Sequence, residues 1–158
     1  MQNKPPLFIY PTVALALLCT TAHRSAWGQG ERTPPIAETV TFLYYQDLEA
    51  AASFYGEKLG LERTLDLDWV KMFRISPSAK VGLVNASGGT HRPSADKPVM
   101  VSFVVDELQQ VDRWYERLKA RGVELTSEPQ DSPRSGVRAF GFRDPEGYTL
   151  EVFAWLKK

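Results

Sequence analysis

The sequence has few of the side chains that build metal centres and disulfides. Its 158 residues include one cysteine and two histidines. Cys19 and His23 both fall in the N-terminal segment, so His91 is the one nitrogen or sulfur ligand type in the rest of the chain. Zinc sites usually take three or more such ligands, and histidine-based catalysis needs a histidine beside its partners. We therefore expect no zinc centre, no disulfide and no histidine-based catalytic site.

An excess of charge of one sign is also missing. The chain carries 19 basic and 19 acidic residues, and neither kind forms a cluster. Nucleic-acid binding needs a basic patch, so we expect no nucleic-acid partner. The length suits one domain of ordinary size with a real hydrophobic core.

The apolar run near the N-terminus, Leu7 to Cys19, is too short to span a bilayer comfortably. Lys4 precedes it, and small and polar residues follow as far as position 28, which is the layout of a secretory signal peptide. We predict that residues 1–28 are such a peptide. The protein is then secreted or periplasmic, with no membrane association after cleavage. The alternative is a membrane anchor that stays attached.

Two further expectations concern the same region. Acylation of Cys19 is less favoured than simple cleavage, because a lipoprotein signal needs small residues before the cysteine and Leu18 is large. Residues 29–38 contain Pro34-Pro35 and are typical of a short disordered leader.

A strand followed by a helix opens the next part of the chain. Val40 to Tyr45 alternates as a β-strand does, and Asp47 is placed to cap a helix that ends at Gly60. The apolar residues of this helix recur at helical spacing and form one stripe. They are Leu48, Ala51, Ala52, Tyr55 and Leu59.

The same pattern returns 60 positions later. Met100 to Val105 is a strand candidate, Asp106 is a plausible cap, and the helix ends before Gly122. Phe54-Tyr55 matches Trp114-Tyr115 at this spacing. The second apolar stripe consists of Leu108, Val111, Tyr115 and Leu118. One structural module therefore occurs twice.

Three short strand candidates follow each helix. In the first module they are 61–67, 70–75 and 80–84, and in the second 123–128, 137–142 and 148–155, with 129–136 as a connection and 86–97 as a linker. We predict an α+β domain over 39–156 made of two βαβββ modules, 39–85 and 97–156. A sheet with a helix on one side leaves its other face open, so two copies most simply form a shared open cleft.

The turn before the last strand holds the most specific local pattern. Asp144 can accept local backbone hydrogen bonds, Pro145 fixes φ, and Gly147 closes a type I turn. In the strand that follows, Leu150, Val152 and Ala154 share one face. The other face carries Thr149, Glu151, Phe153 and Trp155. Glu151 is thus a lone carboxylate among aromatic residues.

These motifs resemble the vicinal oxygen chelate superfamily, also called the glyoxalase/bleomycin-resistance/dioxygenase superfamily. The resemblance covers roughly residues 39–155. It depends on the sequences Asp47-Leu48-Glu49-Ala50, Phe54-Tyr55, Leu59-Gly60-Leu61 and Asp144-Pro145-Glu146-Gly147, with Glu151 after the last.

The metalloenzymes of that superfamily hold a divalent cation with side chains from four strands. The resemblance implies that the ligand positions are Val40, Gly82 or Val84, Met100 and Glu151. Glu151 alone has the ligand type, so we expect no bound metal and no cofactor.

Strand alternation predicts what lines the cleft instead. Residues in phase with Val40 and Glu151 give an apolar, aromatic surface with a few polar groups, which suits a small organic ligand. The candidate ligand-binding residues are Phe42, Tyr44, Ser102, Glu151, Phe153 and Trp155, and Trp69 with Arg74 form a candidate site for an anion.

Each candidate also has a structural interpretation. The aromatic residues could pack on one another or form a dimer face, and we expect a homodimer. Glu151 could pair with Arg138 or Arg143.

The favoured hypothesis is an exported, metal-independent protein that binds or sequesters a small molecule. The alternative is a divalent-metal-dependent lyase, isomerase or dioxygenase of the glyoxalase type. A third reading is a structural dimer whose own side chains fill the cleft.

Overall fold

The computed structural model describes residues 34–157, so the predicted signal peptide and the first half of the leader, residues 29–33, lie outside the described residues. The first module contains β1 (Thr39–Tyr45), α1 (Leu48–Ser53), the π-helical turn η1 (Phe54–Lys58), β2 (Arg63–Asp66), β3 (Val70–Ser76) and β4 (Ala79–Asn85). The second contains β5 (Met100–Val104), α2 (Leu108–Ala120), β6 (Gln130–Ser132), β7 (Val137–Arg143) and β8 (Thr149–Trp155). No helix in the described range is long and apolar enough to cross a membrane.

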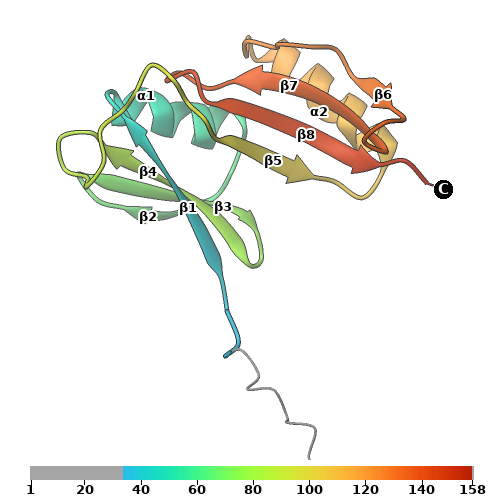
Figure 1. Ribbon diagram of the computed structural model, residues 1–158. Helices are drawn as coiled ribbons and strands as arrows, with labels where there is room; N and C mark the ends of the chain where they lie inside the picture. Colours follow the sequence, from blue (N-terminus) through green and yellow to red (C-terminus); the bar gives the residue numbers. More distant parts are fainter. Residues whose placement is uncertain (1–33, 158) are drawn as a thin grey trace, which may run out of the picture. The chain divides into compact units, whose positions relative to one another are not determined.

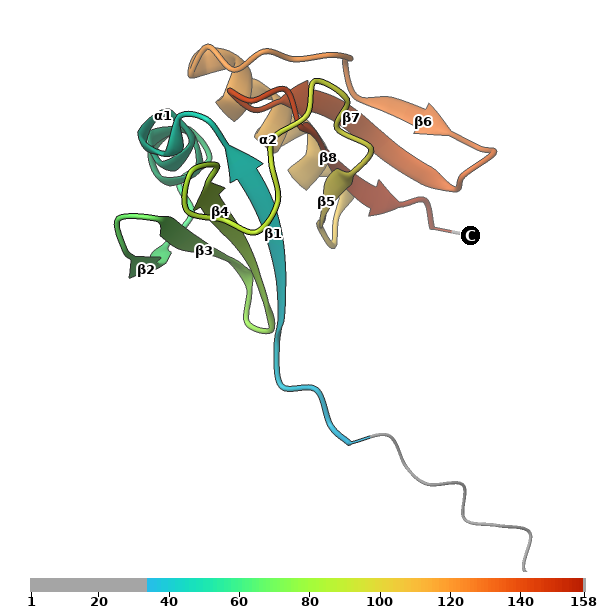
Figure 2. The same cartoon turned by 60° about the vertical axis from the view of Figure 1, so that its left-hand side comes forward.

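Each module folds into one four-stranded mixed sheet (Figures 1 and 2). The strand orders are β1-β4-β3-β2 and β5-β8-β7-β6, and in both sheets the first strand pairs in parallel while the other pairs are antiparallel. This equivalence confirms the predicted α+β class and the two βαβββ modules.

The hydrophobic core lies on the helix-facing side of both sheets and is continuous between the modules. In β8, Leu150, Val152 and Ala154 are fully buried, as the alternation predicts. In β1, Leu43 and Tyr45 are buried while Phe42 on the opposite face is exposed. The faces turned away from the helices are called here the open faces of the two sheets.

The first helix begins where its sequence indicates. The Asp47 carboxylate accepts a hydrogen bond from the Ala50 backbone N–H at 2.9 Å, which satisfies one of the free donors of the first turn. The helix loosens into η1 and ends at Gly60, whose φ of +76° is strained for any residue with a Cβ.

The second helix starts one residue later than predicted. Its N-cap is Glu107, and the Gln110 side chain accepts hydrogen bonds at 3.0 Å from the backbone N–H groups of Glu107 and Asp106. Asp106 therefore contributes its backbone to the cap and is not itself the cap residue.

The strand predicted over 123–128 is wrong, and β6 lies instead in the segment predicted as a connection. Leu125 forms an isolated bridge with Phe142. The β6–β7 hairpin is closed by a turn in which the Gly136 N–H donates to the Ser132 carbonyl at 2.8 Å, and Gly136 takes a φ of +70°. Turn chemistry therefore outweighs the weak apolar alternation of Val123 and Leu125.

Two arginines, Arg117 of α2 and Arg121 at its C-cap, attach the second module to the end of the first helix. The Arg121 guanidinium donates to the carbonyls of Glu57 and Lys58, at 2.6 and 2.9 Å, and Arg117 donates to that of Leu59 at 3.4 Å. These carbonyls have no partner inside their own helix, so the arginines satisfy them. A Cβ at Gly60 would meet only the flexible end of the Arg117 side chain, so the positive φ is the main constraint on this residue.

Candidate functional site

The turn at Asp144 is a buried clamp between the modules. Asp144 is 5% exposed, and its carboxylate accepts hydrogen bonds from the hydroxyls of Tyr45 at 2.6 Å and Tyr55 at 3.3 Å. It also accepts hydrogen bonds from the backbone N–H groups of Glu146 and Tyr148, at 3.0 and 2.9 Å, which are the local bonds expected of the turn. One carboxylate therefore organises its own turn and anchors two tyrosines of the first module.

Burial affects the pKa of all three side chains in this cluster. Burial raises the pKa of Asp144, while the hydrogen bonds from Tyr45 and from the backbone act in the opposite direction. Burial also raises the pKa of Tyr45 and Tyr55 far above the usual phenol range, and the nearby carboxylate adds to the effect. Both hydroxyls keep their protons at neutral pH and act as hydrogen-bond donors.

The rest of the turn completes the clamp. The Tyr148 hydroxyl accepts from the Tyr44 N–H at 3.1 Å and donates to the Tyr44 carbonyl at 3.2 Å, so it occupies the free edge of β1. The Glu146 carboxylate accepts from the Gln46 N–H at 3.1 Å and pairs with Lys97 at 3.4 Å. The sequence signals the turn itself, but the partners of Asp144 and Tyr148 were missed.

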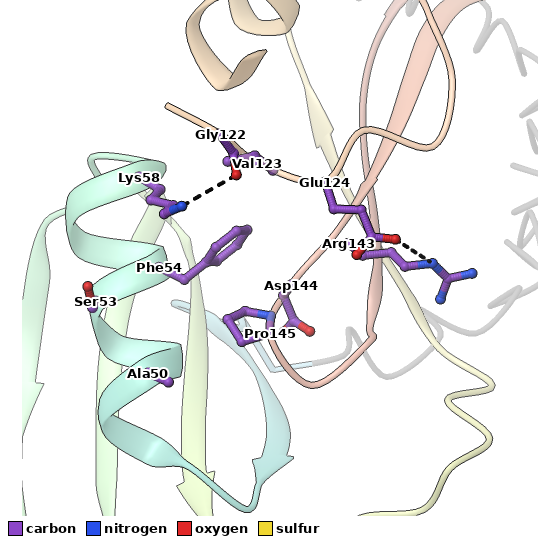
Figure 3. Close-up of a pocket in the computed structure, with 10 residues that line it drawn as sticks. All are labelled: Ala50, Ser53, Phe54, Lys58, Gly122, Val123, Glu124, Arg143, Asp144 and Pro145. Carbon is purple, nitrogen blue, oxygen red and sulfur yellow. Dashed lines mark hydrogen bonds and ion pairs between the residues drawn. The ribbon is translucent and has the colours of Figure 1, made fainter. Parts of the chain in front are cut away.

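A shallow cavity of about 220 Å³ lies between the first helix and this turn (Figure 3). Each of its two cationic side chains has a partner in the lining. Lys58 donates to the Gly122 carbonyl at 3.4 Å, and Arg143 lies 4.0 Å from Glu124. Phe54 points into the space that remains. The cavity therefore offers no free group around which to build a site.

A more distinctive cavity lies on the open face of the first sheet. It has a volume of about 320 Å³ and is lined by Phe42, Tyr44 and Trp69 together with Val84 and residues 88–90. Phe42 is 46% exposed and Trp69 51%, so both rings have surface available to a ligand. The structure thus brings together three of the predicted ligand-binding residues, and this space is called here the aromatic cavity.

Glycines make the aromatic cavity possible. A Cβ on Gly89 would lie 2.5 Å from Cε1 of Tyr44 and 2.7 Å from Cγ1 of Val84, so any larger residue would push the linker off the sheet. The linker also packs on the sheet through His91, whose ring meets that of Tyr44 edge to face with centroids 5.3 Å apart. Residues 88–90 of the linker form one wall of the cavity.

The open face of the second sheet carries the other candidates. The parallel register of β5 and β8 sets Ser102 opposite Glu151, and the Ser102 hydroxyl donates to the carboxylate at 2.6 Å. Phe153 and Trp155 meet edge to face at 5.3 Å, and Trp155 is 62% exposed. The lone carboxylate thus has a hydroxyl partner and aromatic neighbours.

The expected alternative pairing of Glu151 with Arg138 or Arg143 is wrong. Arg138 contacts Asp112 at 2.6 Å and Asp131 at 2.8 Å, and Arg143 lies beside Glu124. Alternation along β7 places Arg138 on the face opposite Glu151, whereas Arg143, which shares the face of Glu151 by register, lies beside Glu124 instead.

The proposed pairing of Trp69 with Arg74 is also not formed. Trp69 lies just before β3, and Arg74 is five positions further on, about 16 Å away at the usual rise per residue. The Arg74 guanidinium is bonded to Glu62 at 2.9 Å. Trp69 belongs to the aromatic cavity alone.

The four implied metal positions do not fit a divalent cation. Val40 and Met100 offer no hard donor, Gly82 has no side chain, and Glu151 alone has an oxygen ligand. The Phe42 ring lies over Gly82, so even a substitution there would first displace the ring. No group of three or more histidine, cysteine, aspartate or glutamate side chains that could hold a metal occurs among the residues described.

Comparison with known proteins agrees with this architecture. Residues 36–152 match the family model described as the Glyoxalase/Bleomycin resistance protein/Dioxygenase superfamily. A glyoxalase/bleomycin resistance protein/dioxygenase from Nocardioides is 33% identical, with 79% of this chain and 85% of that chain covered and a TM-score of 0.65.

Two further solved structures are similar. A lactoylglutathione lyase from Agrobacterium tumefaciens is 27% identical, with coverage of 77% and 96% and a TM-score of 0.64. A genomically encoded fosfomycin resistance protein from Listeria monocytogenes is 20% identical, with coverage of 73% and 90% and a TM-score of 0.59, which is a likeness of fold alone.

Proposed function

Because the chain belongs to the glyoxalase/bleomycin resistance protein/dioxygenase superfamily, we propose that it is an exported member that binds or sequesters a small organic molecule without a metal ion. The observation that carries this proposal is the aromatic cavity, where Phe42, Tyr44 and Trp69 converge on about 320 Å³. Its lining contains no charged side chain, and its size is within the range of small-molecule pockets.

The lining favours a ligand with an aromatic ring. Two exposed rings and the Tyr44 ring can stack on a planar group, and each aromatic contact contributes about 0.5–1.5 kcal/mol beyond area burial. A cation is also accepted by such rings. The ligand class is therefore a small aromatic molecule, neutral or cationic.

Glu151 supplies the polar recognition in this proposal. Its carboxylate accepts one hydrogen bond from Ser102, and its remaining acceptor positions suit a cationic or hydrogen-bond-donating group. This role requires the two open faces to contribute to one cleft, which is the arrangement we propose. It is a prediction separate from the aromatic cavity, because Ser102 lines a different cavity.

We further propose that a second copy of the chain covers part of the open faces. Trp155 is 62% exposed and Val104 58%, and apolar side chains of this size on one face favour an interface. Light scattering after size exclusion should give a dimer mass, and a monomer at all concentrations would refute the dimer while leaving the cavity intact.

The donor set supports metal independence, and elemental analysis tests it. Purified protein should contain no stoichiometric divalent metal, and chelation should leave ligand binding unchanged. A stoichiometric metal whose removal abolishes activity would favour the alternative, a divalent-metal-dependent lyase, isomerase or dioxygenase of the glyoxalase type.

The binding test uses two probes of equal shape, phenyltrimethylammonium and tert-butylbenzene. Trp69→Leu should weaken both probes by about fivefold or more, because both rest on the rings. Glu151→Gln should weaken the cation alone. Unchanged binding in Glu151→Gln would remove Glu151 and the shared cleft from the proposal, whereas unchanged binding in Trp69→Leu would overturn the aromatic cavity itself.

A further inference from the structure

The seam between the two modules contains two cavities that are separate from the aromatic cavity. One has a volume of about 300 Å³ and takes its lining from both modules. The other, of about 310 Å³, lies beside α2. Both are lined by Leu59, Leu61 and Trp114, so they meet at these three residues. The two together are called here the seam groove.

One end of the seam groove is apolar. The β3–β4 hairpin contributes Ile75 and Ala79, β5 contributes Phe103 and Val104, and Val105 follows β5. Such walls suit an aliphatic or aryl group, which gains free energy in proportion to the apolar area it buries. Two serine hydroxyls are the polar groups of this lining, Ser76 and Ser102, and the second is bonded to Glu151.

The other end is cationic. Arg113 and Arg117 are four residues apart on α2, so they project from the same side of the helix, and both line the cavity there. Arg117 also lies over the Trp114 ring, at 5.6 Å from its centroid, and reaches the Leu59 carbonyl. In the described part of the chain neither guanidinium forms an ion pair with a carboxylate, which leaves their positive charges uncompensated.

We propose that the seam groove binds an amphipathic organic carboxylate, with its apolar body among the β3–β4 and β5 side chains and its carboxylate on Arg113 and Arg117. A guanidinium holds a carboxylate with two parallel hydrogen bonds, which fixes the position of the head group. The Glu151 carboxylate behind Ser102 repels an anion from the apolar end, so the charges at the two ends select one orientation. This ligand differs in charge from the one proposed for the aromatic cavity.

Calorimetric titration of the mature protein with dodecanoate, kept below its micelle-forming concentration, tests the proposal. Dodecanoate should bind saturably. Hexanoate should bind at least tenfold more weakly because it buries fewer methylenes, and acetate should give no measurable heat. Dodecyltrimethylammonium should bind more weakly than dodecanoate, because its charge is opposite to the one that Arg113 and Arg117 attract. Equal binding of dodecanoate and dodecyltrimethylammonium would overturn the proposal as non-specific adsorption.

The matched variants are Arg113→Gln and Arg134→Gln. Arg113 is exposed and has no structural bond in the described residues, so its replacement should fold normally, and Arg134 lies in the exposed β6–β7 turn away from the groove. Arg113→Gln should weaken dodecanoate binding by about tenfold or more, because a charge-assisted hydrogen bond is lost, while Arg134→Gln should leave the affinity unchanged. Equal affinity in the two variants would overturn the seam site.

Trp69→Leu separates this inference from the proposed function. Dodecanoate binding should survive Trp69→Leu, because Trp69 lines the aromatic cavity and not the seam groove. If Trp69→Leu abolishes dodecanoate binding, the carboxylate occupies the aromatic cavity and the seam proposal fails. If dodecanoate binds as described while the aromatic probes do not bind at all, the proposed function fails and the seam site stands.

Discussion

Removing a single hydroxyl from the buried clamp should measurably destabilise the whole domain. In Tyr45→Phe the 2.6 Å hydrogen bond to Asp144 is lost, and the carboxylate keeps only the longer bond from Tyr55 and its two backbone donors. A hydrogen bond to a charged group contributes about 1.5–3 kcal/mol, and here the acceptor stays buried after its donor is gone. We therefore expect a loss of about 1.5–3 kcal/mol in the free energy of unfolding at pH 7.

Urea unfolding followed by tryptophan fluorescence measures this loss. With a slope of about 2 kcal/mol per molar urea, the midpoint should fall by about 1 M. Tyr115→Phe is the matched control, since the Tyr115 ring packs on Phe140 and no hydrogen bond of its hydroxyl occurs in the described structure. Its free energy of unfolding should differ from that of the parent by no more than about 0.5 kcal/mol.

The pair of tyrosine variants also tests how the clamp works. If Tyr45→Phe and Tyr115→Phe shift the midpoint equally, Asp144 is not a hydrogen-bonded anchor and the reasoning fails. If Tyr45→Phe causes the larger shift, the free energies of unfolding of Tyr45→Phe, Asp144→Asn and the double variant should be non-additive by about 0.5–3 kcal/mol, as is usual for residues in direct contact.

Three further predictions follow from the same contacts. Burial raises the folded-state pKa of Asp144 above 3.8, so the native state binds the proton more tightly than the unfolded chain does. The free energy of unfolding of the parent, relative to that of Asp144→Asn, should therefore be highest below pH 3.8 and should fall as the pH rises through the folded pKa. Urea titrations across that pH range measure the difference. Gly89→Ala should reduce binding of tert-butylbenzene in calorimetry, because the new Cβ meets Tyr44 and Val84, and unaltered binding would exclude the linker from the cavity wall. Gly60→Ala should cost at least about 1 kcal/mol in chemical unfolding, since the residue has positive φ; an alanine variant as stable as the parent would argue against backbone strain at this position.

The elements that could be predicted from the sequence are those whose apolar residues repeat with a period. The alternation in β1 and β8 predicts strands, and the stripe that begins at Leu48 predicts a helix. Because the first strand and this helix recur 60 positions later, the sequence predicts two modules. The β6 strand could not be found in this way, since Gln130 to Ser132 has no apolar alternation and owes its pairing to the turn at Gly136.

Polar contacts between the modules were also beyond the sequence. Tyr45 and Asp144 are 99 residues apart, and the tyrosine falls at a core position of its strand, where it looks like any other buried aromatic residue. The linker shows the same limit. Gly88 and Gly89 indicate a flexible segment, but their small size matters only because the rings of Trp69 and Tyr44 lie against them.

These contacts explain how the fold can keep its frame while three metal positions hold no ligand. The Asp144 clamp and the arginines on the first helix's carbonyls join the modules on the helix side, so neither open face is needed to hold the two sheets together. The contacts that join the modules therefore do not depend on a metal ligand at Val40, Gly82 or Met100. The open faces can then change their chemistry at little cost in stability, and the aromatic cavity and the Ser102–Glu151 pair lie on those faces.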